Sequence, residues 1–145
     1  MTIQEKLARL KGLKKDLNVL GASVISETED DFIDYNKDQM SEGKRSDGKR
    51  IGVYAWPSYE RFKTQKFPRS GGWVNLELKG DFKSSMRVRT TNNKWQVYST
   101  DSKAKKLQDK YGLDIYGLTP ENMLEYRSKF FMPLFMNRVR MYLNG

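Results

Sequence analysis

The sequence predicts an α+β fold in which helices outweigh a small antiparallel sheet. Three observations support this: helical spacing of Leu near the start, alternation of apolar and polar residues around a turn signal in the middle, and a capped, proline-interrupted helix at the end. We expect a single domain of 145 residues. Its parts are a helical N-terminal segment (1–42), a basic and aromatic arm (43–73) and an α+β core (74–145).

The first segment has the apolar spacing of a helix. Apolar residues recur every three or four positions and so share one face: Ile3, Leu7, Leu10, Leu13, Leu17, Leu20 and Val24. Thr2 and Glu5 match a capping box at its start. Residues 21–23, Gly-Ala-Ser, predict a break. A second helix is expected from Val24 to Met40, and Gly43 ends it.

The arm shows no clean period. It contains Pro57, Pro68 and the pair Gly71-Gly72, which are turn and loop signals. We expect a long ordered loop with one short helical turn around residues 58–62.

The core begins with strand patterns. Alternation of apolar and polar residues after the arm predicts a strand with its apolar positions at Val74, Leu76 and Leu78. The pair Asn92-Asn93 is a hairpin turn signal between two further strands. The positions that share a face on these strands are Met86 with Val88, and Trp95 with Val97.

Helix signals follow the hairpin. Residues 102–110 predict a short helix that ends at Gly112. Thr119 followed by Pro120 predicts the start of the last helix, because Pro is tolerated at the first helical position. Pro133 should kink or split that helix.

The composition excludes several kinds of chemistry. The chain has no Cys and no His, so thiolate nucleophiles, disulfides, imidazole bases and the usual zinc ligands are absent. Acid–base work would fall entirely to Asp, Glu, Lys or Tyr, and we expect neither an enzyme nor a cofactor or metal site. No apolar run approaches the roughly 20 residues of a membrane span, so no membrane partner is expected.

Charge is divided unequally along the chain. Residues 1–43 carry six Lys and Arg against nine Asp and Glu, whereas residues 44–145 carry 21 against nine. The acids of the first part concentrate in residues 27–42, and the candidates for contact with a neighbouring copy are Asp30, Asp31 and Asp34. This cluster is either a solvated helix face or a surface complementary to the basic part of an adjacent copy. The second interpretation gives a closed head-to-tail ring.

The arm combines bases with aromatic side chains. Its candidate subunit-interface residues are Tyr54, Trp56, Tyr59, Phe62, Phe67 and Trp73, and its candidate phosphate contacts are Lys44, Arg45, Lys49 and Arg50. Bases pair with phosphates and aromatic rings stack on nucleobases. Trp, Tyr and Arg are also enriched at protein–protein hot spots. A subunit arm, a non-specific nucleic-acid contact and a purely structural segment therefore all stay open.

A stretch in the second half resembles a known family. Its residues are Gly80-Asp81-Phe82, Ser85-Met86, Ser99-Thr100-Asp101, Lys103-Ala104, Leu107, Lys110-Tyr111-Gly112 and Gly117-Leu118. They resemble the small virion morphogenesis proteins of tailed bacteriophages, of the head–tail connector or tail-completion type, including those of crAss-like phages, over about residues 74–143.

The resemblance implies a virion structural protein. Its copies would form a ring at the neck or tail, with other neck, tail or portal proteins as partners and non-specific DNA contact as an alternative. Its location would be the virion, and the host cytoplasm during assembly. The matching residues form turns and caps, so the resemblance implies no catalytic or ligand residue. The arm at 43–73 departs from the family pattern.

Overall fold

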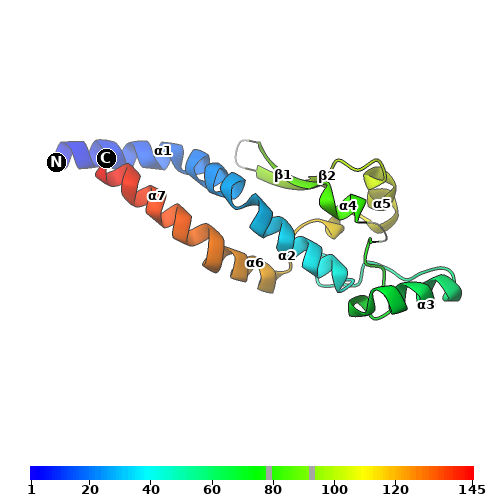
Figure 1. Ribbon diagram of the computed structural model, residues 1–145. Coiled ribbons are helices and arrows are strands. Elements are labelled where there is room, and N and C mark those ends of the chain that lie inside the picture. Colours follow the sequence, from blue (N-terminus) through cyan, green and yellow to red (C-terminus); the bar gives the residue numbers. More distant parts are fainter. Residues whose placement is uncertain (78–79, 92–93) are drawn as a thin grey trace.

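The computed structural model describes residues 1–77, 80–91 and 94–145 (Figure 1). Within these ranges the elements follow in the order α1 (Ile3–Glu27), α2 (Glu29–Ser41), α3 (Pro57–Lys66), η1 (Pro68–Ser70), α4 (Asp81–Ser84), β1 (Met86–Thr91), β2 (Lys94–Ser99), α5 (Ala104–Tyr111), η2 (Leu113–Ile115), α6 (Pro120–Tyr126), η3 (Arg127–Phe131) and α7 (Met132–Asn144). The helices outweigh one two-stranded antiparallel sheet, which confirms the α+β class. The molecule is elongated, with α1 and α7 side by side at one end and α3 at the other.

The N-terminal helix is longer than predicted. The capping box is confirmed, because the Glu5 backbone N–H donates to Thr2 Oγ1 (3.1 Å) and the Thr2 N–H donates to Glu5 Oε2 (2.7 Å). The break expected at 21–23 is wrong: Gly21 lies inside α1, and the chain turns at Thr28 instead. A glycine costs a helix only about 1 kcal/mol, which is too little to interrupt a helix that packs along α7.

The arm contains more helix than predicted. The expected short turn is the ten-residue helix α3, which starts with Pro57 at its first position. No spacing of apolar residues predicted this helix, because the side chain that α3 buries is that of Lys63. The rest of α3 mixes charged, amide and hydroxyl residues with the exposed aromatics Tyr59 and Phe62, which gives no amphipathic pattern.

The strand predicted at 74–78 is wrong for its described part. Val53 and Trp73 form one isolated antiparallel bridge, and the Val74 N–H donates to the Gly52 carbonyl (3.0 Å). The pairing stops there because Leu76 has a φ of 59°, which is incompatible with an extended strand. Leu78 lies outside the described residues.

The second predicted pair of strands is confirmed as the antiparallel hairpin β1–β2. Val88 lies opposite Val97 and Met86 opposite Ser99, which puts the expected side chains on one face. The turn signal at Asn92-Asn93 lies outside the described residues.

The C-terminal helix is divided as predicted, by a π-helical segment. Thr119 caps its start through a bond from the Asn122 N–H to Thr119 Oγ1 (3.3 Å). The helix then passes through η3, a π-helix, before α7 resumes with Pro133 near its start. Pro133 has no N–H to donate to the carbonyl four residues before it. A π segment changes the hydrogen-bond pattern of the helix where that bond is missing. Gly112 ends α5 with a φ of 87°, as its position predicted.

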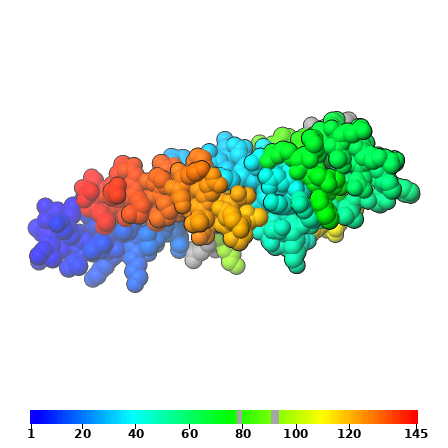
Figure 2. Space-filling model, turned by 90° about the horizontal axis from the view of Figure 1, so that it is seen from below, coloured from blue at the N-terminus to red at the C-terminus, as the bar shows by residue number. Residues whose placement is uncertain are grey.

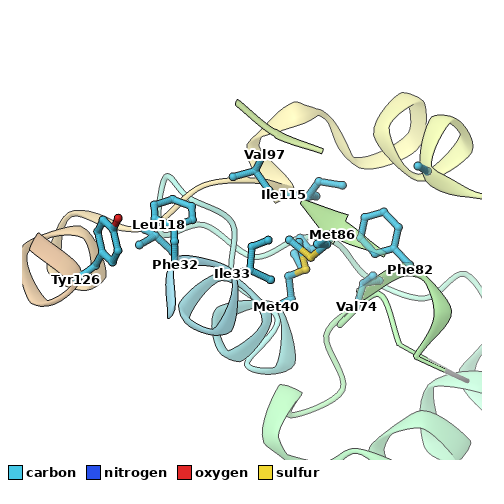
Figure 3. Packing of buried hydrophobic residues seen from close by; sticks show 12 residues of the cluster. Phe32, Ile33, Met40, Val74, Phe82, Met86, Val97, Ile115, Leu118 and Tyr126 are labelled. Atoms are coloured by element: carbon cyan, nitrogen blue, oxygen red, sulfur yellow. The ribbon is translucent and has the colours of Figure 1, made fainter. Parts of the chain in front are cut away.

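The buried core gathers around α2 (Figure 3). Its members are Phe32, Ile33, Met40, Ile51, Val74, Phe82, Met86, Val97, Ala104, Ile115, Leu118 and Tyr126. Phe32 packs edge-on against Trp95 of the hairpin (ring centres 4.6 Å apart) and against Tyr126 of α6 (5.1 Å). One helix thus connects the hairpin to the C-terminal helices.

Two buried amides of α2 fix the segment that leads into α6. Asn36 donates to the Ile115 carbonyl (3.1 Å) and accepts from the Gly117 N–H (2.8 Å). Gln39 donates to the Gly117 carbonyl (3.1 Å) and accepts from the Thr119 N–H (2.9 Å). Both side chains are almost fully buried. The segment makes these bonds in place of a sheet or helix ladder.

We expect Gln39→Leu to lower the free energy of unfolding by about 3 kcal/mol, because it leaves the Thr119 N–H and the Gly117 carbonyl buried without partners. Urea denaturation measures this loss. The same exchange at the exposed Gln65 of α3 is the matched control and should change stability by less than about 0.5 kcal/mol. Equal stability of the two variants would contradict this role for Gln39.

Candidate functional site

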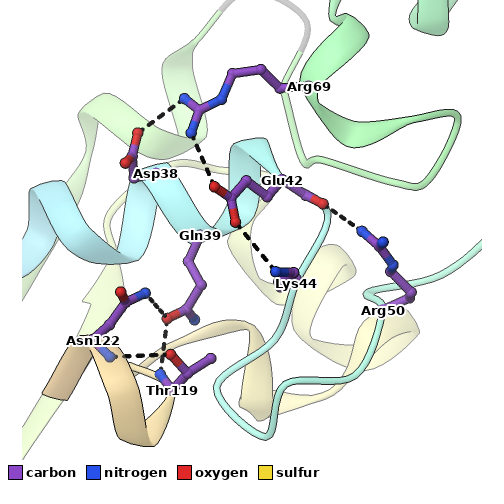
Figure 4. Close-up of polar contacts among 8 residues, drawn as sticks. All are labelled: Asp38, Gln39, Glu42, Lys44, Arg50, Arg69, Thr119 and Asn122. Carbon is purple, nitrogen blue, oxygen red and sulfur yellow. Dashed lines mark hydrogen bonds and ion pairs between the residues drawn. The ribbon is translucent and has the colours of Figure 1, made fainter. Parts of the chain in front are cut away.

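The base of the arm is tied to the acidic end of α2 (Figure 4). Arg69 bridges Asp38 (3.0 Å) and Glu42 (3.4 Å). Glu42 also pairs with Lys44 (3.5 Å), and its carbonyl accepts from Arg50 (2.7 Å). Exposed pairs of this kind each contribute only about 0–1 kcal/mol. They nevertheless place arm bases beside α2 acids within one molecule.

The four candidate phosphate contacts are largely engaged inside the protein. Lys44 and Arg50 are brought together by an antiparallel bridge. Arg45 donates from Nε to Asp47 Oδ1 (3.2 Å). Lys49 makes no ion pair within the described part of the chain, and its side chain is exposed. A phosphate would therefore compete with internal partners for three of the four bases.

The six candidate interface aromatics fall into an inner and an outer set. Tyr54, Phe67 and Trp73 are half-buried, whereas Trp56, Tyr59 and Phe62 are 72%, 41% and 47% exposed. The sets meet where the Tyr54 and Tyr59 rings contact edge to face, with centres 5.3 Å apart. Arg50 lies over the Trp73 ring at 5.4 Å. The inner set packs the arm, and the outer set is open to a partner.

The acidic candidates lie apart from the arm. Asp30 and Asp34 are exposed on α2 and Asp31 is half-buried. Asp31 and Asp34 line an open cavity of about 500 Å³ together with Tyr35 and Phe130. The structure thus brings the arm aromatics Tyr54, Tyr59 and Phe62 into contact, but it does not bring these three acids to them.

A stem formed by α1 and α7 extends away from the core (Figure 2). The helices run antiparallel: the Tyr142 hydroxyl donates to Asp16 (3.0 Å), and Arg138 pairs with Glu27 (2.7 Å). Gly12 gives Tyr142 its space, since a Cβ there would lie 2.6 Å from the Tyr142 oxygen. The N-terminal end of α1 projects beyond the end of α7.

The apolar stripe predicted on α1 is most exposed toward the start of the helix. Val24 is fully buried, whereas Ile3, Leu7 and Leu10 are 75%, 52% and 50% exposed. Further exposed apolar side chains of the stem are Val19, Met132, Met136 and Met141. Exposed bases on α1 are Lys6, Lys11, Lys14 and Lys15. The stem is therefore an apolar surface framed by positive charge.

Lys63, a lysine of the arm, is a buried residue. It is 3% exposed, and its ammonium lies 4.5 Å from the Phe67 ring centre and 5.9 Å from that of Tyr54. Burial lowers the pKa of Lys63 to about 8, and the nearby Glu77 carboxylate acts in the opposite direction. One feature of the sequence could have indicated this burial: aromatic residues lie four positions before and after Lys63, at Tyr59 and Phe67.

A second buried lysine lies close by. Lys83 donates to Ser41 Oγ (2.9 Å) and to Glu77 Oε2 (3.0 Å), and burial lowers its pKa. Lysine is rarely buried, so nothing in the sequence predicts burial at this position.

The fold and these surfaces define a class, a mainly helical α+β protein with a basic aromatic arm and an exposed stem. Residues 1–77, 80–91 and 94–145 hold no group of three acidic, His or Cys side chains placed to bind a metal ion. No helix in those ranges has both the length and the apolar character to cross a membrane. Comparisons with protein-family models, curated proteins and solved structures found no match for the chain.

We expect the stability of the wild type to rise relative to Lys63→Met between about pH 8 and pH 10.5. In this window the unfolded chain still binds the proton that folded Lys63 has lost, so raising the pH favours the folded state. Urea denaturation at several pH values measures the difference. Lys66→Met is the control, because it retains Lys63 and should follow the wild type. Parallel pH profiles for the wild type and Lys63→Met would contradict the lowered pKa.

Proposed function

We propose that this protein is a structural subunit of a tailed-phage neck or tail that assembles through contacts between copies. It would work without a catalytic step or cofactor, next to other neck, tail or portal proteins, in the virion and in the host cytoplasm during assembly. The motif resemblance at residues 80–118 supports the class. The exposed apolar stripe at Ile3, Leu7 and Leu10 supports assembly, because such a surface favours a protein partner.

Charge supports a head-to-tail arrangement of copies. The stem carries exposed bases, including Lys11 and Lys14, and the exposed face of α2 carries Asp30 and Asp34. These two surfaces are not paired with each other inside one molecule. A stem that docks on α2 of the next copy would bury apolar side chains between opposite charges and repeat around a ring.

Charge reversal tests this arrangement. We expect Asp30→Lys/Asp34→Lys and Lys11→Glu/Lys14→Glu each to prevent assembly, because each variant makes both surfaces alike in sign. An equimolar mixture should assemble again, since every contact can then alternate between the variants. Native mass spectrometry and light scattering report the masses. A mixture that stays monomeric while the wild type assembles would contradict the head-to-tail contact.

The apolar stripe has its own test. Leu7→Ser should weaken assembly at least tenfold, whereas Val19→Ser should not, because Val19 is also exposed but lies about 120° around α1 from Leu7, outside the stripe. Sedimentation over a range of protein concentrations measures both. Equal effects of the two variants would exclude the stripe as the contact.

Non-specific nucleic-acid binding is the second candidate function, favoured by the excess of 21 bases over nine acids in residues 44–145. We expect weak binding to duplex and single-stranded DNA, because three of the four candidate bases have internal partners. Affinity measured between about 50 and 200 mM salt decides this. A loss of about 1,000-fold over that range, reduced in Lys49→Gln, would favour the nucleic-acid function instead.

A further inference from the structure

A cavity of about 510 Å³ separates the arm from the α4–α5 part of the core. The arm contributes Tyr54, Trp56, Tyr59 and Lys63 to its wall. Its volume falls within the roughly 300–1,000 Å³ of small-molecule sites. No residue of this cavity belongs to the stem or to the acidic face of α2, so it is separate from the proposed contacts between copies.

Most of the wall is aromatic or aliphatic. The edge-to-face pair Tyr54 and Tyr59 stands beside Trp56 on the arm side, and Leu107 and Tyr111 of α5 also line the cavity. Trp56 is largely exposed and Tyr59 partly exposed, although exposing aromatic rings is unfavourable in water. Such a wall suits a flat ring, which stacks on aromatic side chains whatever its substituents.

The charges around the cavity leave a positive excess. Each acid that lines it already has a lysine partner: Glu77 pairs with Lys83 (3.0 Å) and Asp81 with Lys103 (3.7 Å). Lys63 is almost fully buried with its ammonium against the Phe67 and Tyr54 rings, and the nearby Glu77 carboxylate is already bonded to Lys83. A buried ammonium without an acceptor is costly, and an anion in the cavity would supply one.

The Tyr54 hydroxyl is also incompletely satisfied. Its oxygen is buried and has no hydrogen bond of ordinary geometry within the described part of the chain. The Tyr54 hydroxyl thus lacks a partner in the same wall that holds the Lys63 ammonium. Buried polar groups are otherwise nearly always paired, and an unpaired one calls for an explanation such as an absent ligand.

We infer that this cavity binds an anion joined to a planar aromatic ring, the chemistry of a nucleoside phosphate. The ring would lie among Tyr54, Trp56 and Tyr59, and the phosphate would accept hydrogen bonds from Lys63. Lysine binds phosphate as a compact charge with three donors, which suits a single buried ammonium. This inference does not depend on the proposed assembly function.

Isothermal titration with adenosine 5′-monophosphate tests the site. We expect saturable binding, at least tenfold weaker for adenosine, which lacks the anion, and for ribose 5-phosphate, which lacks the ring. Binding that ribose 5-phosphate matches would overturn the role of the aromatic wall. No heat or chemical-shift change at millimolar nucleotide would overturn the site altogether.

Matched variants locate the binding. Lys63→Met should weaken it at least tenfold, and Lys66→Met on the same helix should leave it within about twofold. Tyr59→Ala should weaken it roughly tenfold, whereas Phe62→Ala, similarly exposed but outside the cavity wall, should not. Because Tyr59 is partly exposed, its variant remains informative even if Lys63→Met fails to fold. Equal affinities within either pair would overturn the assignment.

Affinity should also fall as the pH rises through about 8, where Lys63 loses its proton while the phosphate stays doubly charged. The groups that face Lys63 are Glu77, Lys83, Lys66, Tyr54 and Phe67, and those at the cavity wall are Asp81, Lys103, Lys110 and Tyr111. The fall should be absent in Lys63→Met. A fall of equal size in that variant would overturn the assignment of Lys63.

The source of the ligand is separable in the same assay. A free nucleotide is the ligand if the mononucleotide binds more tightly than a 5′-phosphorylated single-stranded oligonucleotide. A strand end is the ligand if the oligonucleotide binds more tightly and Lys63→Met removes the difference. Binding of an acidic peptide in place of either would overturn the inference and make the cavity a protein contact.

Discussion

The arrangement of this protein depends on two amide side chains, those of Asn36 and Gln39. They project from the central helix α2 and bond the backbone of a segment that has no ladder of its own. Without them, residues 115–119 would bury backbone groups at a cost comparable to the stability of a small domain. With them, α6 starts at a fixed place, and Tyr126 reaches the core beside Phe32.

The same helix organises the charges. Its exposed acids divide into two groups with different neighbours. Asp38 and Glu42 face the arm and meet Arg69, whereas Asp30 and Asp34 face solvent. The sequence is acidic in its first part and basic in its second part, but the folded molecule is therefore not divided into an acidic half and a basic half. Only the charges that stay unpaired within the molecule remain for other molecules to recognise.

Much of the local structure could be predicted because it depends on residues close in sequence. The Thr2 and Thr119 caps, the end of α5 at Gly112 and the β1–β2 pairing are set by neighbouring residues and by alternation. The end of α1 could not be predicted in this way. Its place at Thr28 follows from a bond to Tyr126, 98 positions away in the chain.

The sequence indicated which residue types the candidate site contains, but not which of its side chains lie close together or are buried. The sequence singled out the arm aromatics as a group, yet nothing in it separates the half-buried Tyr54 from the exposed Trp56. Lys63, Lys83 and the two amides of α2 were missed because their importance comes from burial against distant segments. From a single sequence, polar residues at such positions are expected to lie on the protein surface.

The junction at Thr28 sets the direction of the whole stem. Its hydroxyl donates to the Val24 carbonyl (2.8 Å) and meets the Tyr126 hydroxyl (2.7 Å), so one buried pair of hydroxyls joins the end of α1 to α6. At 1.5 Å per residue, the 25 residues of α1 make a lever of about 38 Å. A tilt of about 10° at this pivot moves the tip by about 7 Å, more than one helical turn. Copies of one rigid core could in this way reach neighbours at different spacings.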